Sequence, residues 1–207
     1  MSNPWLGIPL EDYEGHMSAP SVAQAPLLGE QLAAAVKRHR PAGVAVIGCA
    51  GGNGLELLDP TQVERVAAVD INPRYLEVLR ARHARRFARL DLYCEDVQSA
   101  TLDFGPVELI FAALLFEYVQ VPAALATMRR NCPPGGVLVA VLQLPADGQP
   151  LVSASAFRSL EALAPVMRLM DPAEFSRHAQ AAGFTLQDST TQVLESGKRF
   201  EVMSFRG

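Results

Sequence analysis

Apolar runs and helical patterns alternate along most of the chain. Continuous apolar stretches predict buried strands at residues 44–48, 63–70, 88–96, 107–115 and 137–144. Residues 72–86 and 121–132 have the apolar spacing of helices, and a further short helix is expected to begin near Gly54. Strands that are apolar throughout are buried on both faces. The alternation therefore predicts an open, doubly wound α/β fold with a mostly parallel sheet.

The N-terminal part of the chain departs from this alternation. Residues 1–20 show no regular pattern, but they contain Trp5, Tyr13, His16 and Met17. This composition is unlike that of a disordered tail and indicates a segment that folds over another part of the protein. Residues 21–40 have the apolar spacing of a helix that Pro41 stops. We therefore predict an N-terminal lid segment and helix at residues 1–40 and a single domain at residues 41–207.

The C-terminal part departs in another way. Residues 145–170 are predicted to form a small insertion with one amphipathic helix around residues 156–167, and a capped helix is predicted at residues 171–184. Two strands, at residues 184–194 and 198–206, are separated by only three residues, so they must pair antiparallel. The sheet should therefore end in a hairpin.

Composition and charge narrow the class of protein. The chain has 207 residues, of which 49% are hydrophobic, enough for one sizeable core. The formal net charge of -4 does not favour nucleic acid or an anionic membrane as a partner. Three cysteines without zinc-like spacing suit free thiols in a reducing cytosol, and the first residues lack the pattern of a signal peptide. We expect a soluble, cytoplasmic protein with no metal site.

The stretch VAVIGCAGGNG, at residues 44–54, runs from a predicted strand into a loop dense in glycine. Glycine costs roughly 0.5–1 kcal/mol relative to alanine in an ordered element, so this density indicates an elaborate turn or a binding loop. The loop after the first strand of a parallel sheet is the usual cradle for a ligand. Asp70 ends the next strand, where a carboxylate can accept both hydroxyls of a ribose. Together these features indicate a cofactor that contains adenosine.

Two classes of adenosine cofactor have to be distinguished. A nicotinamide or flavin site normally has the pattern GxGxxG, but Ala50 takes the second glycine position here and Asn53 the third. That fingerprint therefore fails. A tight turn between strand and helix, with no ligand, is the less specific interpretation and stays open.

The motifs, taken in order, resemble those of the class I S-adenosylmethionine-dependent methyltransferases over nearly the whole chain. The glycine loop resembles that family's first motif and VAAVDIN, at residues 66–72, its second. YCEDVQ, at residues 93–98, resembles the segment after the third strand, and residues 104–119 resemble the fourth-strand motif. The resemblance implies a three-layer, Rossmann-like sheet of seven strands. Val46 departs from the family, which often carries an acid at that position.

The resemblance also implies S-adenosylmethionine as cofactor and assigns residues to it. Asp70 would hold the ribose with Ile71 against the adenine, and Asp96 would accept the adenine amino group with Val97 beside it. The full set of implied cofactor contacts is Tyr13, Gly48, Cys49, Ala50, Gly52, Asp70, Ile71, Asp96, Val97 and Ala112. Cys49 is expected to be a small apolar spacer, because no base accompanies it in the sequence.

Methyl transfer from a sulfonium needs alignment more than acid or base catalysis, because the cofactor supplies the activation. A base helps by about 10²–10⁴-fold where the acceptor is a hydroxyl or a carbon acid. Glu117, after the fourth strand, and His16, in the N-terminal segment, are the candidate catalytic residues, although either could have a purely structural role. The other three histidines and the arginines at 82, 85, 86 and 89 are expected on the surface.

The sequence therefore predicts a methyltransferase that acts on a small molecule. Outside the core sheet only residues 1–20 and about 145–170 remain to build a substrate site, enough for a lid but not for a docking domain. Two rivals remain. One is a non-catalytic protein that binds S-adenosylmethionine. The other is an NAD-dependent oxidoreductase, which would lack a terminal antiparallel hairpin. The acceptor atom and the oligomeric state are not predicted.

Overall fold

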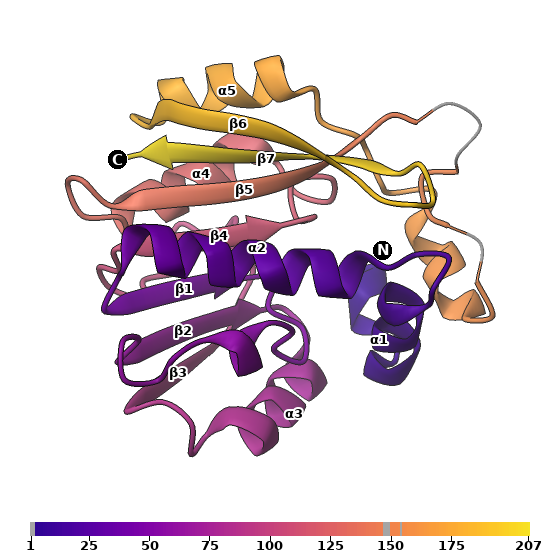
Figure 1. Cartoon of the computed structure of the whole chain (residues 1–207), viewed down its shortest axis with the longest axis horizontal. Coiled ribbons are helices and arrows are strands. Elements are labelled where there is room, and N and C mark those ends of the chain that lie inside the picture. Colours follow the sequence, from indigo (N-terminus) through magenta and orange to yellow (C-terminus); the bar gives the residue numbers. More distant parts are fainter. Residues whose placement is uncertain (1–2, 147–149, 154) are drawn as a thin grey trace.

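A seven-stranded sheet forms the centre of the computed structural model, which describes residues 3–146, 150–153 and 155–207 (Figure 1). The strand order is β3-β2-β1-β4-β5-β7-β6. Strands β1 to β5 pair in parallel, whereas β7 is antiparallel to both β5 and β6. The predicted fold class is thus confirmed. The strands are β1 (Gly43–Ile47), β2 (Arg65–Asp70), β3 (Arg89–Cys94), β4 (Leu109–Ala113), β5 (Val137–Leu144), β6 (Thr185–Val193) and β7 (Arg199–Arg206).

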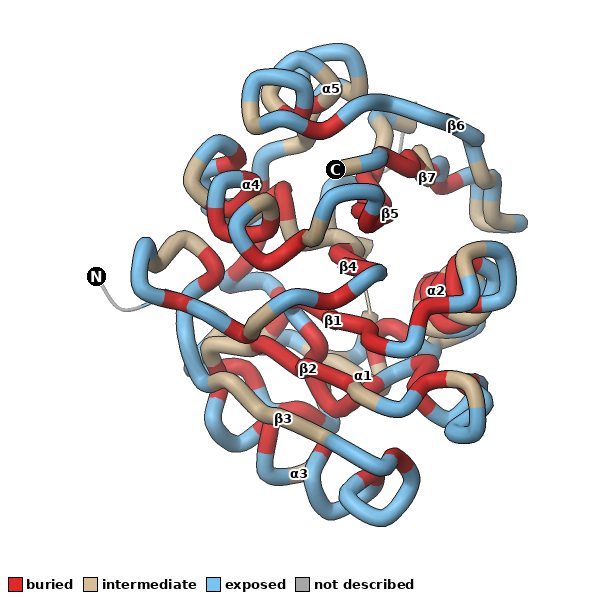
Figure 2. The backbone as a smooth tube through the Cα atoms, turned by 90° about the vertical axis from the view of Figure 1, so that its left-hand side faces the viewer, coloured by how far each residue is buried: buried red, intermediate tan, exposed pale blue. Residues whose placement is uncertain are grey.

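Helices cover both faces of the sheet and make a three-layer architecture. Val44 and Val46 of β1 pack toward α2 and α3, whereas Ala45 and Ile47 of the same strand pack toward α4 and α5. The central strands are buried and the edge strand β6 is exposed (Figure 2). The helices are α1 (Leu10–Ser18), α2 (Gln24–His39), α3 (Pro73–His83), α4 (Val121–Arg130) and α5 (Pro172–Ala181), with 3₁₀ turns η1 (Pro4–Leu6), η2 (Leu55–Leu57) and η3 (Arg158–Leu163).

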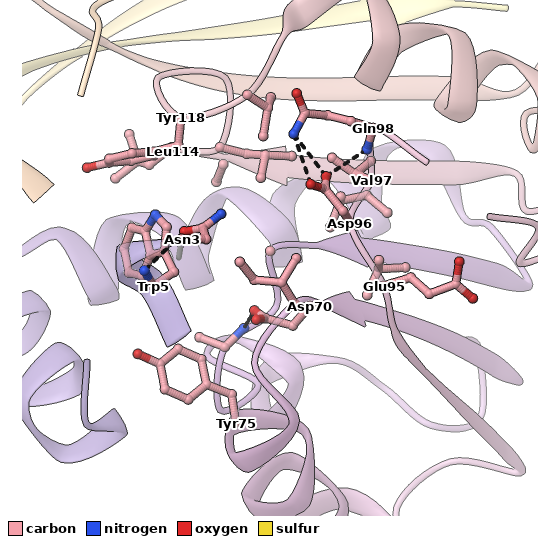
Figure 3. Close-up of a pocket in the computed structure, with 18 of the residues that line it drawn as sticks. Asn3, Trp5, Asp70, Tyr75, Glu95, Asp96, Val97, Gln98, Leu114 and Tyr118 are labelled. Atoms are coloured by element: carbon pink, nitrogen blue, oxygen red, sulfur yellow. Dashed lines mark hydrogen bonds between the residues drawn. The ribbon is translucent and has the colours of Figure 1, made fainter. Parts of the chain in front are cut away.

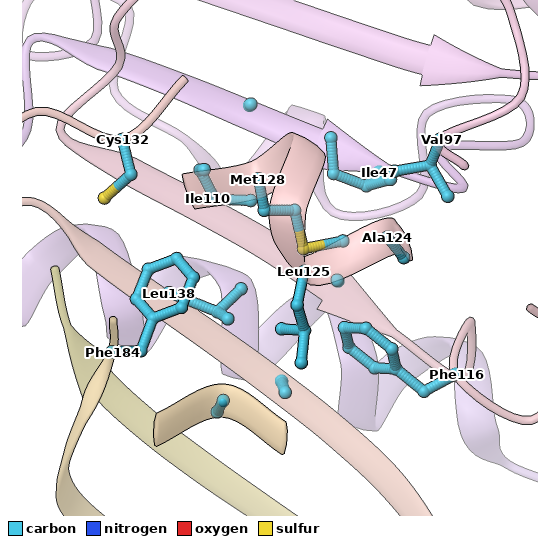
Figure 4. Packing of buried hydrophobic residues seen from close by; sticks show 14 of the residues in the cluster. Ile47, Val97, Ile110, Phe116, Ala124, Leu125, Met128, Cys132, Leu138 and Phe184 are labelled. Atoms are coloured by element: carbon cyan, nitrogen blue, oxygen red, sulfur yellow. The ribbon is translucent and has the colours of Figure 1, made fainter. Parts of the chain in front are cut away.

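The larger core lies between the sheet and the helices α4 and α5. Leu125 and Met128 of α4 are fully buried and meet Ile47 and Leu138 from the sheet (Figure 4). Buried apolar area contributes roughly 25 cal/mol per Å², so this layer fixes the strand ends on which the site depends.

Local capping explains where two helices begin. The Asn72 side chain accepts a hydrogen bond from the Arg74 backbone N–H at 3.1 Å, and Pro73 occupies the first turn of α3. The Asp171 side chain likewise accepts from the Glu174 N–H at 2.9 Å, at the start of α5. Both starts follow the sequence-based expectation.

The expectation that residues 1–20 lack regular structure is wrong. They contain η1 and the nine-residue helix α1, whose Leu10 and Met17 are buried. The segment has weak amphipathic spacing, so tertiary contacts decide its conformation. The Glu14 carboxylate pairs with Arg82 of α3, and the Asp12 carboxylate accepts from the Ser159 hydroxyl at 2.6 Å, which holds α1 between two distant segments.

The helix expected to begin near Gly54 is also absent, and only the three-residue turn η2 is formed. Gly54 has a φ of +86°, which is not helical, and a Cβ at this position would lie 2.7 Å from the Gly29 Cα of α2. Helix α2 packs against η2, β4 and β5 on this side of the sheet, and its close approach at Gly29 constrains the loop at Gly54. The amphipathic helix expected at residues 156–167 is likewise reduced to η3.

Candidate active site

A cleft opens at the carboxyl ends of β1, β2 and β4 (Figure 3). Ligands of open parallel sheets bind at this edge, where the strand order reverses. We call this cleft the first cavity.

Asp70 lies on the floor of the first cavity, at the end of β2. One carboxylate oxygen accepts from the Ala50 N–H and the other from the Asn72 N–H, each at 2.9 Å. Burial raises the pKa of Asp70, and these backbone hydrogen bonds oppose that rise. The carboxylate is therefore fixed in direction and keeps lone pairs for two further donors, as the hydroxyls of a ribose require.

Asp96 and its neighbours line the opposite end of the first cavity. Gln98 holds the Asp96 carboxylate through its side-chain amide, at 3.0 Å to each oxygen, and through its backbone N–H at 2.9 Å (Figure 3). Ile71 and Val97 supply apolar surface beside it. Apolar side chains with a carboxylate beside them match the chemistry of an adenine ring and its amino group.

The glycine loop gives the first cavity a bare backbone edge. Gly48 is exposed at the end of β1 with a φ of +71°, and Ala50 has a φ of +45°. Leu114, at the end of β4, also has a positive φ of +52° and lines the same cleft. Non-glycine residues in the left-handed region cost of order 1–3 kcal/mol each and concentrate at functional sites. The backbone here is thus held in an unfavourable conformation beside the cleft.

Aromatic rings from the N-terminal segment cover the first cavity. The Trp5 ring makes edge contacts with Tyr13 at 5.6 Å and with Tyr118 at 5.1 Å between ring centroids, and Tyr13 stacks on Tyr75 at 6.3 Å. The Tyr75 hydroxyl donates to the Ile8 carbonyl at 2.9 Å, which anchors the segment to α3. Burial and the nearby Asp70 carboxylate raise the pKa of Tyr13 above its ordinary value.

A second, smaller cavity adjoins the first. Both are lined by Trp5, Tyr13, Leu114 and Tyr118, so these four residues form the junction between them. His16 lines only the second cavity, and its Nδ1 lies 2.9 Å from the Ser155 hydroxyl. Burial lowers the pKa of His16, and the charge of Lys198 lowers it further. His16 is therefore neutral at neutral pH and can accept a proton.

Glu117 is buried behind the junction, with 1% of its surface exposed. One carboxylate oxygen accepts from the Gln143 N–H at 2.8 Å, while the other has no hydrogen-bond partner among the described residues. Burial raises the pKa of Glu117 to about 7. Its side chain lines neither cavity, although its neighbour Tyr118 lines both.

The structure brings most of the predicted cofactor contacts together. Those that line the first cavity are Tyr13, Gly48, Ala50, Asp70, Ile71, Asp96 and Val97. Cys49 and Ala112 are instead buried in the core, which agrees with the expected spacer role of Cys49. Gly52 lies against His83, where a Cβ would be 3.0 Å from the imidazole.

Three residues at the two cavities are not singled out by the sequence. Gln98 lines the first cavity, and Gln143 and Lys198 line the second. The YCEDVQ motif could have drawn attention to Gln98, but no local pattern places the others at a site.

His83 corrects the expectation that the three helix-borne histidines lie on the surface, because it is buried at 7% exposure. Glycine at position 52 leaves the space that its ring fills.

Three of the four arginines of the cluster make contacts within the protein. Arg82 pairs with Glu14, and Arg89 pairs with Asp91 at 2.8 Å. The Arg86 guanidinium donates to the carbonyls of Leu55, Glu56 and Leu58. These interactions use much of the hydrogen-bonding capacity that a phosphate backbone would need.

Comparison with known proteins identifies a domain within the chain. Residues 45–140 match the family model described as "Methyltransferase domain". This segment of the chain is therefore a methyltransferase domain. The matched residues include the glycine loop, Asp70 and Asp96, so these candidate cofactor contacts lie within the domain. S-Adenosylmethionine is the cofactor, and the bare edge at Gly48, the Asp70 carboxylate and the apolar side chains of Ile71 and Val97 fit it.

Solved methyltransferase structures share the fold. The N-methyltransferase NodS from Bradyrhizobium japonicum, in complex with S-adenosyl-L-homocysteine, has a TM-score of 0.67 at 16% identity over 89% of this chain and 87% of its own. A methyltransferase from Mesorhizobium loti has 0.69 at 14%, over 86% and 96%. Magnesium protoporphyrin IX methyltransferase from Synechocystis, with the same product bound, has 0.67 at 11%, over 90% and 84%. No curated protein sequence matches the chain.

Two further observations limit the alternatives. The antiparallel hairpin of β6 and β7, which the NAD-dependent oxidoreductase hypothesis did not allow, is present, so that hypothesis is wrong. Among the described residues, no helix is both long and apolar enough to span a membrane.

Proposed function

We propose that the protein transfers the methyl group of S-adenosylmethionine to a small-molecule acceptor held in the second cavity. The observation that carries this proposal is the junction of Trp5, Tyr13, Leu114 and Tyr118, where a site for the cofactor meets a separate, smaller cavity. Two adjoining sites allow acceptor and cofactor to be bound side by side, which in-line displacement requires. The neighbouring methyltransferases with bound product, which share this fold, support the same assignment.

The residues of the chain contribute mainly position and environment. When bound, the cofactor supplies an activated methyl group on a positively charged sulfur. Asp70 and Asp96 would orient its nucleoside, and the rings of Trp5, Tyr13 and Tyr118 suit a cation at the junction. The same rings exclude water from the place where the methyl group passes.

A proton released by a hydroxyl or amine acceptor needs a base. His16 is better placed than Glu117, because it lines the second cavity and its depressed pKa keeps it neutral. Glu117 lines neither cavity, so we assign it a positioning role through the Gln143 backbone. His16 is therefore our candidate for the base, at an expected contribution of about 10²–10⁴-fold.

We also propose domain bounds, a cellular location and a class of partner for the protein. We propose residues 1–40 as a lid and covering helix and residues 41–207 as the catalytic domain with an insertion at about 145–170. The three cysteines are free thiols, which supports a cytoplasmic location. The internally paired arginines support a partner other than nucleic acid.

The test has a binding stage and a turnover stage. Calorimetry with S-adenosylhomocysteine should give saturable one-site binding, and S-adenosylmethionine labelled in its methyl group should then label an acceptor from a small-molecule panel. Binding without any turnover would favour the non-catalytic alternative, and absence of binding would contradict both. On the best acceptor, His16→Ala should lower kcat by about 10²–10⁴-fold without changing product affinity. His178→Ala, a half-buried histidine of α5, is the control.

A further inference from the structure

The second cavity combines apolar walls with a buried cation. Leu160, Leu163 and Met167 line one side of it, and Lys198 lines it from the start of the last strand. Lys198 is one of only two lysines in the chain, and 2% of its surface is exposed. Lysine is almost never fully buried unless it is paired, so this position needs a reason.

The hydrogen bonds of Lys198 leave most of its donor capacity unused. Its Nζ donates to the Leu151 carbonyl at 3.0 Å, and an ammonium has three donors. Among the described residues no carboxylate lies within ion-pair distance of this nitrogen. His16, which shares the cavity, is neutral and cannot balance the charge. Among the described residues, therefore, nothing supplies a negative charge to balance Lys198 at the polar end of the cavity.

A second donor points to the same place. The Gln143 side-chain amide donates to the same Leu151 carbonyl at 2.9 Å, so it lies close to the Lys198 ammonium. An amide nitrogen has two donors, and one remains for another partner. A cation with an adjacent amide donor is a chemically complementary pair for a carboxylate.

The backbone keeps Lys198 in this position. The turn that joins β6 to β7 is closed by hydrogen bonds from the Leu194 N–H to the Lys198 carbonyl and from the Gly197 N–H to the Leu194 carbonyl, each at 2.9 Å. The turn lies on the same side of the molecule as α1 and η3 (Figure 1). The terminal hairpin therefore delivers the cation to the cavity without a long mobile loop.

We propose that the acceptor is a small, mostly apolar acid whose carboxylate binds Lys198 and Gln143, with its apolar body against Leu160, Leu163 and Met167. This inference rests on the proposed function, because it names the substrate class of the same site. The carboxylate serves as the anchor, and the group that receives the methyl faces the junction. Burial lowers the pKa of Lys198 to about 8, so the ammonium still predominates at pH 7.

The experiment compares acids with their neutral amides. Three matched pairs, 4-hydroxybenzoate, 3-phenylpropanoate and hexanoate with the corresponding carboxamides, are titrated calorimetrically at pH 7 into protein saturated with S-adenosylhomocysteine. At least one acid should bind about 10- to 100-fold more tightly than its amide, since a charge-assisted hydrogen bond is at stake. If no acid binds more tightly than its amide, the proposal is overturned.

Two variants then test whether Lys198 is the source of the preference for acids over amides. Lys198→Met should abolish the acid preference, and Lys37→Met, which removes the other lysine from an exposed position on α2, should retain it. Lys198→Met should also keep or raise Tm, because it removes a buried uncompensated charge. A Tm loss in Lys198→Met with the acid preference intact would mean that Lys198 only ties down the Leu151 segment, and would overturn the proposal.

The outcomes separate this proposal from the proposed function. If S-adenosylhomocysteine fails to bind, the proposed function is wrong, but the acid and amide titrations can still be run without it. If the cofactor product binds and the acids show no preference, methyl transfer stands and only the assignment of the acceptor fails.

Discussion

The two cavities are neighbours but are built in different ways. The first is made from the ends of adjacent parallel strands, where the sheet pairs Ile47 with Val69 and Asp70 with Cys94 in register. The second is made from side chains of α1, the segment after β5, η3 and the terminal hairpin. Main-chain hydrogen bonds thus position the proposed cofactor site, whereas side chains from far apart in the sequence shape the proposed acceptor site.

This difference in construction separates cofactor binding, which methyltransferases have in common, from the choice of acceptor, in which they differ. A site made from strand ends persists as long as the sheet does, so it can serve any acceptor. A site made from covering segments can change without disturbing the sheet, and we propose that substrate choice resides there. Substitutions in the two regions should therefore have separable effects, and the following predictions test that separation.

The largest effect is expected at Glu117, behind the junction. Burial raises its pKa from an ordinary 4.5 to about 7, so between these values the unfolded chain is ionised while the folded protein keeps the proton. Stability is therefore lost as pH rises through this window, by about 3 kcal/mol in total. Glu117→Gln should remove that loss, as measured by urea unfolding at pH 5 and pH 8.

The exposed Glu30 of α2 provides the control for this pH effect. Glu30→Gln removes the same charge and should leave the pH dependence of the wild type in place. An equal pH dependence in Glu117→Gln and the wild type would contradict the buried, proton-retaining role of Glu117.

Asp70→Ala should impair binding in the first cavity and leave the second cavity unaffected. Loss of charge-assisted bonds to the ribose should weaken the binding of S-adenosylhomocysteine by about 1.5–3 kcal/mol, measured by calorimetry. Lys198→Met should leave that dissociation constant unchanged, because Lys198 lines only the second cavity. An unchanged affinity in Asp70→Ala would refute the role assigned to the carboxylate.

Asp96→Ala should have a smaller effect, of about 1 kcal/mol, because its carboxylate is exposed and water competes for the same bonds. A more specific measurement is the selectivity of binding between ligands with and without the adenine amino group. The wild type should prefer S-adenosylhomocysteine to the inosine counterpart that lacks the amino group, and Asp96→Ala should narrow that preference. A preference of the same size in both proteins would place the adenine elsewhere.

The smallest effect is expected at Ala50, in the glycine loop. Its φ of +45° is unfavourable for alanine, so Ala50→Gly should stabilise the protein by about 0.5 kcal/mol after allowance for the more flexible unfolded chain. Ala34→Gly, at an exposed position inside α2, should instead destabilise it by about 1 kcal/mol. Equal signs for the two changes in Tm would show that backbone strain at Ala50 is negligible.

The contrast between strand-end and side-chain construction also explains which parts of the molecule could be predicted from the sequence. The strands and the helices α3, α4 and α5 follow from apolar runs and local caps, and the terminal hairpin follows from the three-residue spacing between its strands. Asp70 and Asp96 could be placed because each lies at or just after a strand end, so the sheet itself fixes their surroundings.

The second cavity could not be predicted in this way. Lys198 and His16 are 182 positions apart and meet only because the hairpin and α1 both fold over the same edge. The missing helix after Gly54 has a similar cause, since Gly29 of α2 approaches Gly54 closely and constrains the loop. Burial and long-range packing decided these features, and neither leaves a periodic signal in the chain.

The close approach of Gly29 to Gly54 has a consequence for ligand exchange. Helix α2 is also packed into the core through Leu32 and Val36, so we expect it to stay in place when the segment before it moves to admit a cofactor. Any opening has to pivot in the five residues between α1 and α2, where Ala23 already has a left-handed backbone with φ +49°. The segment that has to move is thus short, and its pivot lies directly before a helix that belongs to the core.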